Sequence, residues 1–230
     1  MPRGQTFAQV VLAARQESGH STSAAPGRNV ADLVEQTVRR VYERLHQDYD
    51  WPHLSIRRDI PMEAGFRFYN FPSDLDPDRT GRAWILEDEG THWRPVEYGI
   101  GPAHWNAFNP ERDERTDPVR AWQRYEGGMI EVWPTPLTAH GTLRLEGMPY
   151  PNALVEDGAV VDLDSNLIAL YAAGEILQRQ NSTDAQLKLE QAQTLYNRLK
   201  SNSQRSNPVF ALNRTRGDDY SPVTRVRAPR

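Results

Sequence analysis

Cysteine is missing from this chain of 230 residues. Its absence excludes a disulfide framework, a thiolate metal site and a cysteine nucleophile at the same time. Long hydrophobic runs are missing as well, because the apolar stretch at residues 7–14 is only eight residues long. A membrane span needs about 20 apolar residues, and nothing at the start of the chain resembles a signal peptide. We therefore expect a soluble, non-secreted protein.

Motifs that would carry catalysis or metal binding are also scarce. Residues 74–78 copy the opening of a calcium-binding loop, but the chain then has Arg79 and Ile85 where that loop requires glycine and a bidentate glutamate. The acidic residues 87–89 lie where a solvated turn between strands is expected. The six histidines show no paired helical spacing, and no G-x-S-x-G or P-loop motif is present. We therefore predict no catalytic residue, no cofactor and no metal site.

Charge is distributed unevenly along the chain, whose net charge is −4. From residue 201 onward, six arginines and two aspartates give a net charge of +4, which leaves −8 on residues 1–200. A basic block on sequence rich in proline, serine and asparagine is typical of a solvated arm that orders on a partner. An unattached terminus without such a role is the alternative.

Four segments carry the three-and-four spacing of an amphipathic helix. They are residues 6–18, 29–49, 164–180 and 183–200. The connection between the last two is short, which predicts an antiparallel helical hairpin. Gly174 on the third segment would let a neighbouring helix approach closely, at some cost in helix propensity.

Between residues 54 and 151 the hydrophobic period changes from helical spacing to two. Seven short segments rich in aromatic and β-branched residues are bounded by glycine, proline or aspartate, which predicts a compact antiparallel sandwich or barrel. Residues 129–150 alternate apolar and polar side chains on both sides of a turn with two prolines and a glycine. We expect this stretch to form a hairpin of the sheet, with Ile130 and Val132 on one face and Glu131 and Trp133 on the other.

These segments predict an α+β fold. A bundle of about four helices, two N-terminal and two C-terminal, would carry an inserted antiparallel β-sandwich or barrel and an extended C-terminal tail. The expected domain boundaries are 1–53 for the N-terminal helices, 54–151 for the β domain, 152–200 for the C-terminal helical hairpin and 201–230 for the basic arm. The helices on either side of the insertion must pack on each other to bury their apolar faces.

Aromatic residues offer two further interpretations. Residues 99–118 contain many turn formers and are expected to be a long exposed loop. In this loop Trp105 and Phe108 would be exposed apolar side chains, which indicates a protein contact. Most of the six tryptophans should lie in the core, although some could form a platform on which sugars stack.

Three phrases of the sequence resemble a known family. The segments "DWPHL", "IEVWPTP" and "LIALYAAGEILQRQ", in this order, resemble head–tail adaptor (connector) proteins of tailed bacteriophages, in particular the tail tubular protein A type. The likeness covers roughly residues 29–200. It implies a structural protein of the virion at the head–tail junction, with no enzymatic activity. Such adaptors form a ring, usually a dodecamer, that binds the portal, joins a tail nozzle or tail tube protein and extends the channel for double-stranded DNA.

The resemblance also assigns expected contact residues. The helices that carry Val34, Val41, Leu170, Tyr171, Leu177 and Tyr196 would build the ring wall. The basic arm would contact the portal or a neighbouring subunit through Arg205, Phe210, Arg214, Arg216, Tyr220, Arg225 and Arg227. An acidic lumen would let DNA slide without sequence-specific binding, because it repels phosphates.

Two other functions stay open at this point. A carbohydrate-binding or receptor-binding tail module would use exposed tryptophans. A glycan hydrolase would need a carboxylate such as Glu87.

Overall fold

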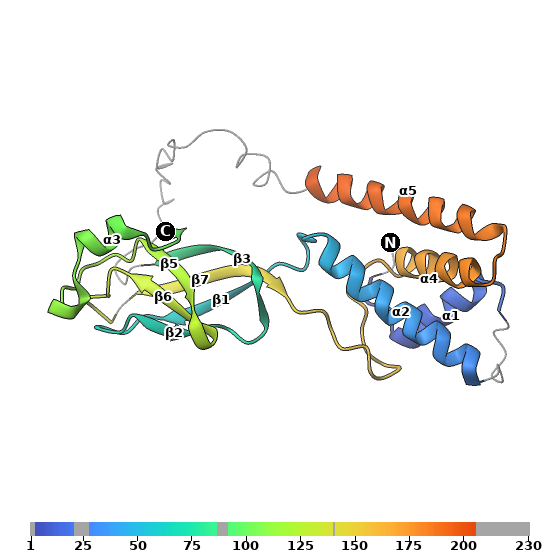
Figure 1. Ribbon diagram of the computed structural model, residues 1–230, viewed down its shortest axis with the longest axis horizontal. Helices are drawn as coiled ribbons and strands as arrows, with labels where there is room; N and C mark the ends of the chain where they lie inside the picture. Colours follow the sequence, from blue (N-terminus) through green and yellow to red (C-terminus); the bar gives the residue numbers. More distant parts are fainter. Residues whose placement is uncertain (1–2, 21–27, 87–91, 140, 206–230) are drawn as a thin grey trace, which may run out of the picture.

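The computed structural model describes residues 3–20, 28–86, 92–139 and 141–205. Helices lie at both ends of the chain and a seven-stranded sheet lies between them. The molecule is elongated, with the long helices at one end and the strands at the other (Figure 1). We call these two parts the helix body and the β body. The predicted α+β class is confirmed.

The helix body consists of α4 and three helices that pack around it. Asp164 caps α4 through a bond that its side chain accepts from the backbone of Leu167, and Thr6 and Gln9 form a capping box at the start of α1. Both caps satisfy backbone donors that would otherwise be free. The helices are α1 Phe7–Glu17, α2 Arg28–Asp48, α4 Ser165–Arg179 and α5 Asp184–Arg205.

The core of the helix body combines both ends of the chain. Val34 and Val41 of α2 and Leu167 of α4 are fully buried, and burial of each such side chain contributes about 1.5–3 kcal/mol. Helices α4 and α5 approach closely at Gly174, where an added Cβ would lie 2.7 Å from a methyl group of Leu189. The close approach expected at this glycine is confirmed.

The β body is a nearly closed, barrel-like sheet in the order β1-β7-β3-β4-β5-β6-β2. Its own hydrophobic core includes Trp122, Ile130, Val132, Leu143 and Leu145. The strands are β1 Ile56–Pro61, β2 Phe68–Asn70, β3 Leu75–Leu86, β4 Arg94–Tyr98, β5 Ala121–Tyr125, β6 Met129–Trp133 and β7 Thr142–Pro149; between them lie helix α3 Pro102–Ala107 and the 3-10 turns Pro110–Arg112 and Glu126–Gly128.

Two expectations about the sheet are wrong. Strands β6 and β7 do not pair with each other, because β6 lies between β5 and β2 while β7 lies between β1 and β3. The connection between them, residues 134–141, is longer than a tight hairpin loop and contains two prolines, which cannot donate to a ladder. The sheet is also not fully antiparallel, since β4 and β5 run parallel.

The boundary of the C-terminal arm is also corrected. Helix α5 continues to Arg205, so residues 201–205 are helical and do not belong to an extended arm. The other arm residues singled out from the sequence lie outside the described residues. They are Phe210, Arg214, Arg216, Tyr220, Arg225 and Arg227.

Candidate assembly surfaces

Arg79 makes one of the connections between the β body and the helix body. Arg79 of β3 donates to the Asp50 carboxylate (2.8 Å) and to the Tyr49 carbonyl (3.0 Å), just beyond the end of α2. Its Nη1 also lies 3.2 Å from Nδ1 of His46, which is fully buried. Because a guanidinium can only donate, the imidazole nitrogen must accept, so the ring is neutral with its proton on Nε2. Burial agrees with this state, because it lowers the pKa of His46 below its ordinary value of 6.5.

The end of α5 is attached to the same joint. The Trp51 side chain is buried, its indole N–H donates to the Leu45 carbonyl (2.9 Å), and its ring lies 6.0 Å from the ring of Tyr196. Ser203 and Tyr49 hydroxyls are 2.9 Å apart. The "DWPHL" phrase therefore marks the place where the two bodies meet, a role that the helix-ending signal alone did not indicate.

Residues 99–118 are more ordered than the exposed loop expected from the sequence. They include the short helix α3, whose His104 carbonyl accepts a hydrogen bond from the Trp133 indole (3.0 Å). Trp105 is 42% exposed, and its ring centre lies 4.5 Å from that of Trp133. Phe108 is half-buried. Trp105 is therefore displayed from an anchored helix, while Phe108 is less exposed than expected.

A buried ion pair lies below this helix. The Glu131 carboxylate is 1% exposed and contacts Arg67 Nε at 3.1 Å, while Gln123 donates to its other oxygen (2.8 Å). The Arg67 guanidinium also lies over the rings of Phe68 (4.6 Å) and Trp105 (5.2 Å). The alternation in the sequence predicts that Ile130 and Val132 face the opposite side from Glu131 and Trp133. In the structure all four are buried, so the alternation did not reveal that Glu131 lies inside the protein.

Exposed apolar side chains gather beside this ion pair. Phe66 is 57% exposed and Leu137 is 56% exposed, and the Gly65 backbone hydrogen bonds to Pro136, which places their two loops together. We call Phe66, Trp105 and Leu137 the β tip. Exposed apolar groups of this size on one end of a molecule indicate a protein contact.

The tryptophans do not form a platform for sugars in the part of the chain that the structure describes. Trp51, Trp122 and Trp133 are buried, and Trp105 is the one exposed tryptophan among the described residues. The half-buried Trp93 is covered by the Arg144 guanidinium, 3.8 Å from its ring centre.

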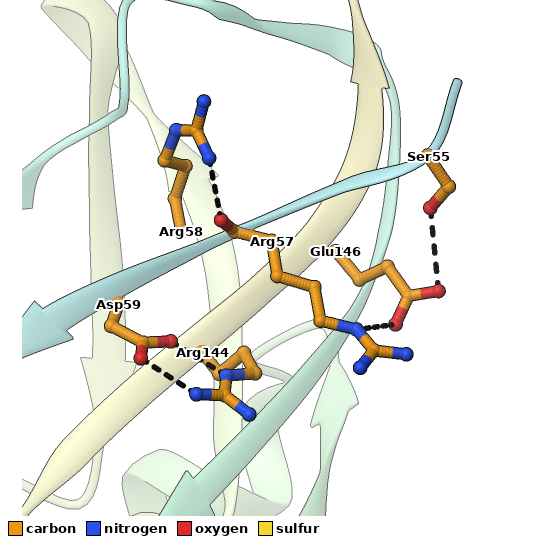
Figure 2. A network of polar contacts seen from close by, with 6 residues as sticks. All are labelled: Ser55, Arg57, Arg58, Asp59, Arg144 and Glu146. Atoms are coloured by element: carbon orange, nitrogen blue, oxygen red, sulfur yellow. Dashed lines mark hydrogen bonds and ion pairs between the residues drawn. The ribbon is translucent and has the colours of Figure 1, made fainter. Parts of the chain in front are cut away.

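The outer face of β1 and β7 carries a row of paired charges (Figure 2). Arg144 donates twice to Asp59 (2.6 and 2.7 Å), and these hydrogen bonds lower the pKa of the Asp59 carboxyl. Arg57 donates to Glu146 (3.0 Å), which also accepts from the Ser55 hydroxyl. Because each of these arginines faces a carboxylate, the row is electrically balanced and gives no continuous basic strip for DNA phosphates.

The residues proposed for the ring wall divide into two groups. Val34, Val41 and Leu177 are buried inside the helix body, so contact with another subunit would come from other side chains on these helices. Leu170, Tyr171 and Tyr196 are half-buried.

Tyr171 and Tyr196 line an open groove of about 350 Å³ that runs over α4 between α2 and α5. Its rim carries Arg44, which donates to Glu175 of α4 (2.7 Å) and lies 5.3 Å from the ring centre of Tyr171. Arg40 pairs with the same carboxylate. The groove is lined by Arg44, Leu45, Asp48, Tyr171, Glu175, Gln178, Leu189, Gln193 and Tyr196.

No group of three or more histidine, cysteine, aspartate or glutamate side chains that could hold a metal ion occurs within residues 3–20, 28–86, 92–139 and 141–205. No helix in these same ranges is long and apolar enough to cross a membrane. Glu87, the carboxylate named for a hydrolase, lies outside the described residues.

Comparison with known families identifies this architecture. The family model described as SU10 adaptor protein matches residues 5–223. The chain belongs to the SU10 adaptor protein family. A comparison with curated proteins finds no match. The family gives this adaptor a structural role in a phage, and the resemblance noted at residues 29–200 is confirmed. The match also includes α1 and most of the C-terminal arm, which that resemblance did not cover.

Proposed function

We propose that this adaptor forms a ring at the junction of the phage head and tail, of twelve copies as in the head–tail adaptors that it resembles. In this ring the portal binds on one side and a tail nozzle or tail tube protein binds on the other. Double-stranded DNA passes through the centre without sequence-specific binding. The observation that carries the proposal is the family match over nearly the whole chain.

The shape of the molecule supports contact at two ends. The helix body and the β body lie at opposite ends of an elongated subunit, and α3, which carries the exposed Trp105 of the β tip, lies at the end away from the helices (Figure 1). A subunit that joins two different partners requires two separate surfaces. The helix body would form the ring wall, since a ring of identical copies requires two complementary faces on each copy.

The charge distribution supports the other contacts. Residues 206–230 contain five arginines and two aspartates, a net charge of +3, so the remainder of the chain carries −7. A basic arm of this kind would bind an acidic surface of the portal or of a neighbouring copy. An acidic body would suit a lumen that repels DNA, and a ring structure with an arginine-lined bore would contradict that lumen.

Removal of the arm tests the proposal. A chain ending at Arg205 keeps α5 and the Ser203–Tyr49 contact, so we expect unchanged helix content by circular dichroism. We expect this truncated chain to lose attachment to the portal protein of the same phage, as seen by negative-stain electron microscopy. A matched full-length variant with Arg214, Arg216, Arg225 and Arg227 changed to lysine should still attach, because it keeps the charge. Equal attachment of the truncated and full-length chains would contradict the role of the arm.

A further inference from the structure

The turn at residues 155–158 projects from the helix body between β7 and α4. Val155 is 76% exposed, and Glu156 and Asp157 follow it on the surface. Neither of these two carboxylates has a hydrogen-bond or ion-pair partner among the described residues. The turn therefore presents to solvent an apolar side chain, Val155, beside two unpaired carboxylates.

The turn is held firmly although its side chains are free. The backbone N–H groups of Phe7 and Ala8 donate to the carbonyls of Ala159 (2.8 Å) and Asp157 (3.1 Å). Arg39 of α2 donates to the Leu154 carbonyl (2.7 Å), and Leu154 itself is buried. The turn is thus preorganised, which lowers the entropic cost of binding a partner.

The groove between α2 and α5 has the complementary character. Its apolar lining includes Leu189 and the Tyr171 ring, and the half-exposed Arg40 and Arg44 lie at one end of it. Both arginines share Glu175, whose side chain is only 16% exposed. Asp48, one turn further along α2, adds an exposed carboxylate to the lining, so the positive charge is confined to the end of the groove at Arg40 and Arg44.

The turn and the groove lie on different flanks of α2. Arg39 points to the turn, whereas Arg40 and Arg44 point to α4 and the groove. Two complementary surfaces on different sides of one subunit cannot meet within that subunit, but they can join identical copies head to tail into a ring.

We propose that neighbouring copies of this adaptor meet through the 155–158 turn of one copy and the α2–α4–α5 groove of the next. In this contact Val155 packs on Leu189 and Tyr171, while Glu156 and Asp157 pair with Arg40 and Arg44. This inference rests on the proposed ring.

Cross-linking tests the contact directly, because the natural chain has no cysteine. The full-length chain is prepared as two single variants, Val155→Cys and Gln178→Cys, of which the second lies in the groove and is exposed. They are assembled together on the portal of the same phage and treated with a short bis-maleimide. We expect a linked dimer only in the mixture, and a ladder of oligomers when both changes are on one chain.

The matched control combines Val155→Cys with Glu126→Cys, an exposed position on the β body, and should give no ladder. A charge variant, Glu156→Arg with Asp157→Arg, should lower the ring yield about tenfold or more, because four cations would then meet. Changing Glu111 and Glu126 to arginine on the β body should leave the yield unchanged.

The outcomes separate this inference from the proposed function. Rings that form normally but show no link between Val155→Cys and Gln178→Cys would overturn the contact and leave the ring role intact. If the unmodified chain forms no ring on the portal at all, both proposals are overturned.

Discussion

The helix body and the β body are stabilised by different means. Among the described residues, the core of the helix body contains 21 buried hydrophobic residues, drawn from both ends of the chain, whereas the β body has a separate core of 11. The β body adds ion pairs of arginine with carboxylates, including the buried Arg67–Glu131 pair and the Arg144–Asp59 pair. The helix body has ion pairs as well, such as those of Arg40 and Arg44 with Glu175, but their arginines are exposed, whereas Glu131 is buried. The difference teaches that the insertion keeps an ion pair inside its body, while these ion pairs of the helices lie at the surface.

The two bodies also differ in how the chain builds them. The strands come from one continuous segment, Ile56 to Pro149, whereas the helix body requires α1 and α2 to meet α4 and α5 from the other end. Met148 at the end of β7 belongs to the core of the helix body, so the insertion contributes side chains to both hydrophobic cores. Arg79 and Trp51 then fix the joint between them.

Deleting a core side chain should have the largest effect and separate the two bodies. Leu167→Ala leaves a cavity in the helix core and should lower the free energy of unfolding of that body by about 2–5 kcal/mol. Circular dichroism at 222 nm reports the helices during denaturation. In a Trp51→Phe background, which removes the tryptophan of the helix core, fluorescence of the buried Trp122 and Trp133 reports the β body. We expect two transitions, of which only the one that circular dichroism reports shifts to a lower denaturant concentration.

Leu145→Ala is the matched change in the β core and should move the fluorescence transition instead. A single transition that shifts equally for both variants would show that the two bodies unfold as one unit.

A glycine in the β body should give a smaller effect of a different origin. Gly147→Ala would place a Cβ 2.2 Å from the Thr80 hydroxyl oxygen and 2.9 Å from its Cα, at an irregular pairing of β3 with β7. The backbone must move, so we expect a loss of about 1–3 kcal/mol in the β transition alone. Gly81→Ala in the paired strand β3 would place its Cβ with no atom within 4 Å and is the control. Equal stability of both variants would contradict the close approach at Gly147.

The smallest expected effect lies at the joint and depends on pH. His46 faces Arg79, Asp50, Asp76 and Asp162, and burial lowers its pKa. The unfolded chain therefore binds a proton at this residue below pH 6.5 while the folded chain does not, so stability falls as the pH drops below 6.5, by at most about 1.4 kcal/mol per pH unit.

His46→Gln should reduce the difference in unfolding free energy between pH 7.5 and pH 5.5, because glutamine can accept from Arg79 but cannot titrate. His53→Gln is the comparison, because burial also lowers the pKa of His53. It should reduce the difference too, but by less, because the His53 side chain is more exposed. An unchanged pH dependence in His46→Gln would show that this residue does not report on the joint.

Local pattern was sufficient for much of the fold. Spacing of apolar residues gave the four long helices, and caps such as Asp164 fixed one helix start, because both depend on near neighbours in the chain. Period-two alternation located the strands for the same reason. It did not reveal which strands pair. Strands β6 and β7 are adjacent in sequence, yet they do not pair with each other.

The candidate surfaces were less accessible to sequence reasoning. Trp105 was identified correctly as exposed, because polar turn formers surround it. Nothing local indicated that Glu131 is buried against Arg67, that Arg79 reaches α2, or that the turn at residues 155–158 is anchored to α1.

By itself the sequence determined the class of the fold, the family resemblance and the absence of cysteine, since these follow from residue type and short-range spacing. Only the tertiary structure decided the strand order, the joint between the bodies and the surfaces that a second copy could meet. Those features depend on residues far apart in the chain whose free energy of contact appears only after folding has brought them together.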